Sequence, residues 1–159
     1  MSGFEDRPNR LPWPPLIFVA AAALALVLHF WLLPLPWVPA PFSDFLFAVG
    51  WLVAAGALAI DVGAMRAMRR AATTILPNRA ADHLVVTGPF SFTRNPIYVG
   101  NTMLMIGVGL ILGAVWFLIL APVAAYATTK LAIEREERHL EARFGKKYRD
   151  YRKKVRRWL

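Results

Sequence analysis

Two adjacent glutamates, Glu136 and Glu137, are candidates for chemistry. They lie where the last long apolar stretch of the chain would leave a membrane. A carboxylate pair at the mouth of a pocket would face a polar or cationic ligand. The same sequence also fits a solvated helix turn, in which Glu134 pairs with Arg138 at a spacing of four residues. Position alone leaves both interpretations open.

A second polar group, in the sequence RNPIY, precedes another apolar run. Asn95 is a typical N-cap residue and Pro96 suits the first turn of a helix, so a helix is predicted to begin there. Arg94 could orient an anionic group, or its side chain could extend to lipid phosphates. Asp61, inside an apolar run, could contact a ligand or pair with a nearby arginine.

The composition indicates a membrane protein. The 159 residues are 57% hydrophobic and 18% charged, whereas soluble domains are nearer half apolar and a quarter charged. The length indicates a single domain. Cysteine is absent and the three histidines are far apart in the sequence, so we expect neither a disulfide framework nor a metal centre.

Long apolar runs predict four membrane-spanning helices. Two of these apolar runs are each long enough to cross a bilayer once. The run at residues 97–131 is too long for one crossing, at about 1.5 Å per residue, and predicts a helical hairpin. Gly113 breaks this run, so the turn is expected at residues 112–114. The predicted spans are residues 16–33, 45–64, 97–112 and 115–133.

The distribution of basic residues predicts the orientation. Of the nineteen lysines and arginines, two precede the first span, five lie between the second and third spans, and twelve follow from Lys130 onward. All of them fall on one side of the four-span arrangement. By the positive-inside rule, both termini and the connector are cytoplasmic, and the loop at residues 34–41 is outside.

The carboxyl-terminal residues predict a helix on the membrane surface. Tyr148, Tyr151, Val155 and Trp158 are spaced to share one helix face, with basic residues on the other face. Such a helix would lie against anionic headgroups. This explanation accounts for most of the net charge of +9 without a nucleic-acid partner.

These features predict an all-α, polytopic membrane protein. It would have four transmembrane helices, a helical hairpin among them, and a cytoplasmic or interfacial C-terminal helix. Within one domain, the expected parts are two N-terminal spans (1–64), a cytoplasmic connector (65–95), the helical hairpin (96–133) and cytoplasmic C-terminal helices (134–159).

Three linked pieces of the chain resemble a known superfamily. They are LVVTGPFSFTRNPIYVG, an apolar hairpin, and EREERHLEARFGKKYRDYRKKV, in that order. From about Leu84 to the carboxyl end, the sequence resembles the integral-membrane methyltransferases of the isoprenylcysteine carboxyl methyltransferase and phospholipid N-methyltransferase superfamily, as a small prokaryotic-type member. The resemblance implies methyl transfer from S-adenosylmethionine to a lipid-like or small apolar acceptor, in a prokaryotic inner membrane.

The resemblance also implies a cofactor site on the cytoplasmic side. Leu84 and Val85 would contact the adenine end, and Phe90 would supply an aromatic side chain nearby. Arg94 and Glu137 are the catalytic candidates, with Arg94 orienting the cofactor carboxylate or an anionic acceptor. The residues expected around the methionyl part are Asn95, Pro96, Ile97, Tyr98 and Glu136.

Two departures from the family pattern leave the acceptor open. Asn95 stands where the eukaryotic prenylcysteine enzymes have histidine, and Ala132 stands where they have an arginine for the prenylcysteine carboxylate. The alternatives are a phospholipid amine N-methyltransferase, an NADPH-dependent reductase of the sterol-reductase type, and a non-catalytic membrane lipid-binding protein.

Overall fold

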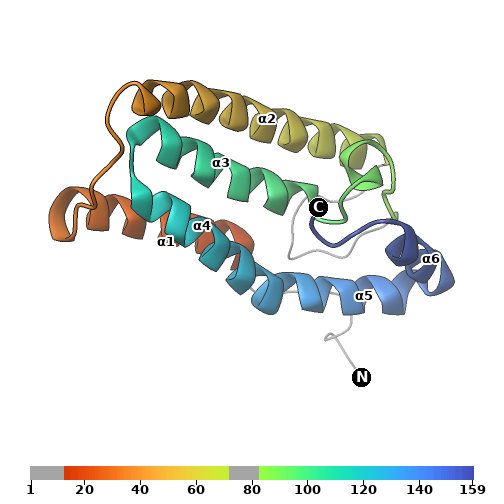
Figure 1. The fold of residues 1–159 in the computed structure, drawn as a ribbon. Coiled ribbons are helices and arrows are strands. Elements are labelled where there is room, and N and C mark those ends of the chain that lie inside the picture. Colours follow the sequence, from red (N-terminus) through yellow and green to blue (C-terminus); the bar gives the residue numbers. More distant parts are fainter. Residues whose placement is uncertain (1–12, 72–82) are drawn as a thin grey trace.

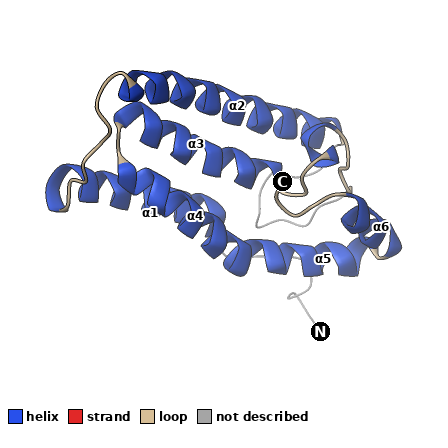
Figure 2. Ribbon diagram, viewed as in Figure 1, coloured by secondary structure: helices blue, strands red, loops and turns tan. Residues whose placement is uncertain are grey.

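The computed structural model describes residues 13–71 and 83–159, and its helices lie side by side in one bundle (Figure 1). Within the described residues the regular elements are all helical (Figure 2). The helix α2 packs against α3, α3 packs against α4, and α4 packs against α1. Residues 72–82 of the predicted connector lie outside the described residues.

The first two helices follow two of the predicted apolar runs, but the second is longer than predicted. Helix α1 covers Trp13–Val27 and continues as a π-helix over Leu28–Leu32, whereas α2 covers Phe42–Arg70. The connector was expected from residue 65, yet the helix continues through 65–70. This segment has no proline or glycine. Two arginines in the last turn interact favourably with the negative end of the helix dipole and so stabilise the longer helix.

Helices α3 and α4 cover Pro96–Leu112 and Val115–Thr128 and are joined by two residues. Gly113, the first of these, has a φ of 62°, in the left-handed region that favours glycine and commonly ends helices. Beyond α4 the chain stays helical through a π-helix at Thr129–Ile133 and then α5 at Glu134–Phe144.

Three helical stretches in the described residues are long and apolar enough to cross a membrane. Helix α3 is also apolar but has 17 residues, fewer than the roughly 20 that a crossing usually needs. Large apolar side chains such as Val19, Trp51 and Leu52 are exposed on the outside of the bundle. These features indicate an integral membrane protein. The three long stretches are Pro14–Leu32, Phe42–Arg70 and Val115–Phe144.

Small residues bring the helices close together. A Cβ atom added to Gly50 of α2 would lie 2.9 Å from the carbonyl oxygen of Gly107 in α3, so the two backbones are in contact there. On the other side of α3, Phe18 and Ala25 of α1 join Phe117 of α4 in the main buried cluster. This packing holds α3 between α2 and the α1–α4 pair, and several candidate site residues lie in the first turn of α3.

The carboxyl-terminal segment differs from the predicted surface helix. Helix α6 covers Lys146–Lys154, and Val155 has extended backbone angles, so residues 155–158 do not continue the helix. Tyr148 and Tyr151 are 1% and 8% exposed. Their spacing therefore reflects packing inside the protein, and the prediction that they face the membrane is wrong. The basic residues of α6 remain candidates for contact with anionic headgroups.

Candidate functional site

The candidate site residues gather where α6 and the last residues of the chain lie against the end of the connector (Figure 1). The connector ends in a short 3-10 helix, Gly88–Ser91, which packs against α2. The tail segment, residues 155–158, then runs beside residues 93–95, with a parallel bridge between Thr93 and Arg156. The backbone amide of Arg94 donates a 2.9 Å hydrogen bond to the Arg156 carbonyl oxygen.

Glu137 is the centre of a buried charge cluster. Its Oε1 atom accepts hydrogen bonds of 2.9 Å from Arg94 Nη2 and 2.9 Å from Arg157 Nε, and its Oε2 atom accepts one of 2.7 Å from Arg157 Nη2. The Arg94 side chain is 9% exposed and that of Glu137 is 11% exposed. A solvated helix turn therefore does not describe Glu137, although Glu134 is solvated and pairs with Lys130 instead of Arg138.

Among the described residues, only one nitrogen of the Arg94 guanidinium, Nη2, donates a hydrogen bond. Its Nε and Nη1 atoms are buried and have no hydrogen-bond partner among the described residues. Buried polar groups are normally paired, and an unpaired one costs about 1–3 kcal/mol, or more when it is charged. The position therefore favours a ligand that brings oxygen acceptors, such as a carboxylate or a phosphate.

Glu136, next to this cluster, contacts the first turn of α3. The Tyr98 hydroxyl donates a 2.8 Å hydrogen bond to Glu136 Oε1. This contact fixes one oxygen of the half-buried carboxylate. A carboxylate held in this way suits an ammonium group, which donates but cannot accept hydrogen bonds.

Asn95 occupies the predicted N-cap position of α3, and Pro96 begins the helix. The Asn95 side chain makes no capping hydrogen bond. Instead, Asn95 Nδ2 donates a 2.8 Å hydrogen bond to the Arg157 carbonyl oxygen. The fully buried Thr93 hydroxyl donates to the same carbonyl oxygen at 3.2 Å. The Asn95 side chain therefore binds the tail segment and does not cap the helix.

Tyr148 and Tyr151 connect the charge cluster to the connector. Burial raises the pKa of both phenols. Glu137 raises the pKa of Tyr148 further, whereas the charge of Arg94 and its side-chain contact with the Tyr148 phenol lower it. Both phenols are therefore protonated at neutral pH, and the Tyr151 hydroxyl donates a 2.7 Å hydrogen bond to the Phe90 carbonyl oxygen. The hydrogen bonds to Glu137 raise the pKa of Arg157 above its usual value.

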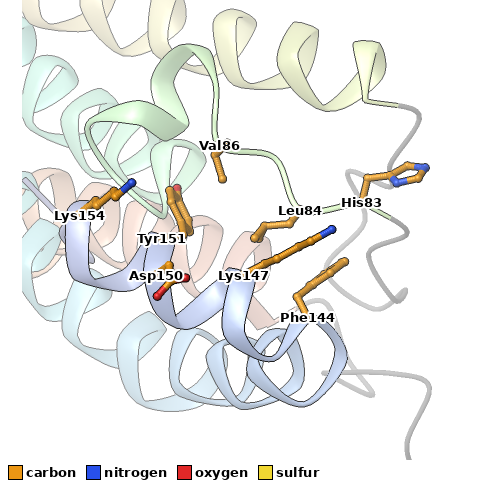
Figure 3. Close-up of a pocket in the computed structure, with 8 residues that line it drawn as sticks. All are labelled: His83, Leu84, Val86, Phe144, Lys147, Asp150, Tyr151 and Lys154. Atoms are coloured by element: carbon orange, nitrogen blue, oxygen red, sulfur yellow. The ribbon is translucent and has the colours of Figure 1, made fainter.

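A cavity of about 560 Å³ lies between the connector and α6 (Figure 3), within the range usual for small-molecule sites. Leu84 and Val86 line it from the connector, and Tyr151 lines it from α6, so it adjoins the tyrosine pair. Apolar and polar side chains both contribute to its wall. The full lining is His83, Leu84, Val86, Phe144, Lys147, Asp150, Tyr151 and Lys154.

The structure brings most of the predicted site residues into one region. The charge cluster and the Tyr98–Glu136 pair share the end of the connector and the starts of α3 and α5, whereas Leu84 lines the cavity. Val85 and Ile97 are half-buried, and Pro96 is fully buried. Asp61 of α2 faces the start of α3: its carboxylate packs against Gly100, and its Oδ1 has no hydrogen-bond partner among the described residues.

Sequence reasoning missed several residues of this region, among them Thr93, Tyr148, Tyr151 and Arg157. It assigned Arg157 to a basic helix face and both tyrosines to a membrane-facing one. Their spacing carried no signal of their partners, which are distant in the sequence. No group of three or more His, Cys, Asp or Glu side chains in residues 13–71 and 83–159 could hold a metal ion.

The donors and acceptors of this region fit S-adenosylmethionine. Arg94 offers buried nitrogen atoms for the cofactor carboxylate, Glu136 offers a carboxylate for its amino group, and the adjoining cavity has partly apolar walls for a nucleoside. The carboxylate, the amino group and the nucleoside of the cofactor each have a candidate partner among these residues.

Comparison with known proteins identifies the family. The profile of the phospholipid methyltransferase family matches residues 45–147. Protein-S-isoprenylcysteine O-methyltransferase of Schizosaccharomyces pombe (strain 972 / ATCC 24843) is 34% identical over 82 residues, which are 51% of this chain and 35% of that relative. The matched segment thus covers about a third of the relative's length. No solved structure matches significantly. Because the profile covers more than half of the sequence, the chain belongs to the phospholipid methyltransferase family, within the superfamily that also contains the isoprenylcysteine enzymes.

Proposed function

We propose that this protein transfers a methyl group from S-adenosylmethionine to a lipid-like or small apolar acceptor, as an isoprenylcysteine carboxyl methyltransferase-like enzyme. The observation that carries the proposal is the pair of complementary groups at one site. Glu136 is fixed by Tyr98, and the buried Arg94 has two nitrogen atoms without a partner among the described residues. A ligand with both an ammonium and a carboxylate group would satisfy them together.

The two ends of the site would bind different parts of the cofactor. Glu136 would hold the amino group and Arg94 the carboxylate, while Leu84 and the adjoining cavity would take the adenosine. Glu137, a catalytic candidate by resemblance, has both oxygens bonded to arginines, so we assign it a positioning role. The remaining proposed contacts are Val85, Phe90, Asn95, Pro96, Ile97 and Tyr98.

The chemistry would require little acid or base catalysis. S-adenosylmethionine supplies a methyl carbon that is already activated by the adjacent sulfonium. The protein would hold the acceptor in line with this carbon, and such alignment alone accelerates a reaction greatly. A carboxylate or thiolate acceptor needs no base, whereas an amine acceptor must first lose a proton. An apolar acceptor would reach the site from the bilayer, between the helices.

We further propose four membrane crossings, with α3 as a short one. Both termini and the connector would lie in the cytoplasm of a prokaryote, and residues 34–41 outside its inner membrane. The support is the distribution of lysine and arginine, which are absent from residues 34–41 and from the short α3–α4 turn. The basic face of α6 would then contact anionic headgroups.

Calorimetric titration of the purified protein in detergent with S-adenosylmethionine tests the cofactor. We expect the wild type to bind and Glu136→Gln to bind at least about tenfold more weakly, because a charge-assisted hydrogen bond is worth about 1.5–3 kcal/mol. Glu141→Gln is the matched control, since Glu141 lies on the same helix and pairs with the exposed arginines Arg149 and Arg152. No binding by the wild type would contradict the proposal.

Methyl transfer itself requires a separate experiment. The wild type would be incubated with methyl-labelled cofactor and a total lipid extract, and the labelled products separated. We expect a labelled apolar product. Label in a phospholipid amine headgroup would instead identify the protein as a phospholipid N-methyltransferase, and cofactor binding without any labelled product would indicate a non-catalytic protein.

A further inference from the structure

The tail segment, residues 155–158, is built into the candidate site. Its backbone pairs with residues 93–95 through the Arg94 amide and through the side chains of Thr93 and Asn95, as described above. The Trp158 indole Nε1 donates a 3.2 Å hydrogen bond to the Thr129 hydroxyl, just before α5. The tail therefore joins the two elements that carry Arg94 and Glu137.

Arg157 determines how Glu137 and Arg94 meet. It occupies Glu137 Oε2 and shares Oε1, in a bidentate contact of 2.7 and 2.9 Å. The Arg94 side chain makes one hydrogen bond with the described residues, from Nη2 to Glu137 Oε1. Its Nε and Nη1 atoms consequently have no acceptor among the described residues.

The contact of Arg157 with Glu137 limits what Arg94 can donate to the same carboxylate. An arginine beside a carboxylate commonly forms two parallel hydrogen bonds. Glu137 could offer both of its oxygens to Arg94 if Arg157 did not already occupy them. With Arg157 present, the Arg94 guanidinium keeps donors for another anion in a buried position, where such donors bind strongly.

We infer that Arg157 is a positioning residue: by occupying Glu137, it keeps two nitrogen atoms of Arg94 available for the cofactor carboxylate. This inference rests on the proposed function, because it takes S-adenosylmethionine as the ligand of Arg94. The net charge of the cluster, two guanidinium groups and one carboxylate, also favours an anionic group.

A comparison of two ligands tests this role. The probes are S-adenosylmethionine and its decarboxylated form, which lacks the carboxylate but retains the amino group and the sulfonium. We expect the wild type to prefer the carboxylate-bearing form by about tenfold or more, the ratio that one charge-assisted contact provides. In Arg157→Ala this preference should fall to nearly one, because Glu137 can then take the released Arg94 donors.

Three variants separate positioning from a general effect on folding. Arg152→Ala is the matched control, since it removes an exposed contact to Glu141 at 3.2 Å on the same side of the molecule, and it should keep the wild-type preference. Arg157→Lys keeps the charge without the bidentate contact and should give an intermediate preference. Thermal unfolding in detergent checks that each variant is folded at the titration temperature.

The outcomes are distinct for the two proposals. If Arg157→Ala weakens both ligands equally, or keeps the wild-type preference, the positioning role is overturned while the proposed function stands. If the wild type binds neither ligand, the proposed function fails, and this inference fails with it. Should Arg157→Ala be unfolded, Arg157→Lys decides, and a full wild-type preference in that variant overturns the inference.

Discussion

Replacement of Glu137 by glutamine should destabilise the folded protein strongly. The carboxylate accepts three hydrogen bonds from two guanidinium groups. Removal of one partner of a buried ion pair costs about 3–5 kcal/mol. Arg94 is 9% exposed, but Arg157 is 37% exposed, so solvent screening reduces its share. Glutamine also keeps one oxygen acceptor. We therefore expect the low end, about 3 kcal/mol.

Thermal unfolding in detergent, followed by circular dichroism, measures this effect. For a chain of this length, 1 kcal/mol corresponds to about 2–4 °C, so Glu137→Gln should lower the Tm by about 6–12 °C. Glu141→Gln, one helical turn later on α5, loses only exposed contacts and should change the Tm by less than about 2 °C. Equal decreases in the two variants would refute the claim that Glu137 holds a buried cluster.

Two further predictions concern helix packing and alkaline pH. Gly50→Ala should destabilise the protein by about 1–3 kcal/mol, because the new Cβ would lie 2.9 Å from the Gly107 carbonyl oxygen. Gly56→Ala, whose nearest neighbour is a flexible methionine methyl at 3.6 Å, should be neutral or slightly stabilising; equal losses of Tm would contradict the close contact. Burial raises the pKa of Tyr151 above its ordinary value near 10. The unfolded chain then loses this proton first, so wild-type stability should fall as the pH rises above about 10. Tyr151→Phe should show a smaller alkaline decrease in Tm, and an unchanged pH profile would show that this phenol does not contribute.

The apolar runs of the sequence predicted most of the helical structure. Long apolar stretches and the break at Gly113 depend on nearby residues, and the structure has helices at those places with a turn at that glycine. The end of α2 was predicted too early, because the apolar run ends just before the next arginine, Arg66, whereas helical conformation continues through Arg70. Hydrophobicity marks the part of a helix suited to lipid, and hydrogen bonding decides where the helix ends.

The site could be predicted only in part. Resemblance supplied the residues from Leu84 to Glu137, and their roles stay predictions. The tail could not be placed, since alternating tyrosines and basic residues describe an amphipathic segment without saying what covers its apolar face. Arg157 lies in a basic run that looks solvated, and its partner Glu137 is 20 residues away. Contacts of this kind depend on the tertiary fold.

The pairing of the tail with residues 93–95 also has a consequence for the order of folding. The hydrogen bonds of the Arg157 carbonyl oxygen join residues separated by 62 and 64 positions, whereas the α3–α4 turn is entirely local. Closing so long a loop costs more conformational entropy than forming the local hairpin. We therefore expect the helices to associate first and the tail to dock last. Native-state hydrogen exchange should then find the Arg94 amide exchanging through a local opening, well before the bundle itself unfolds.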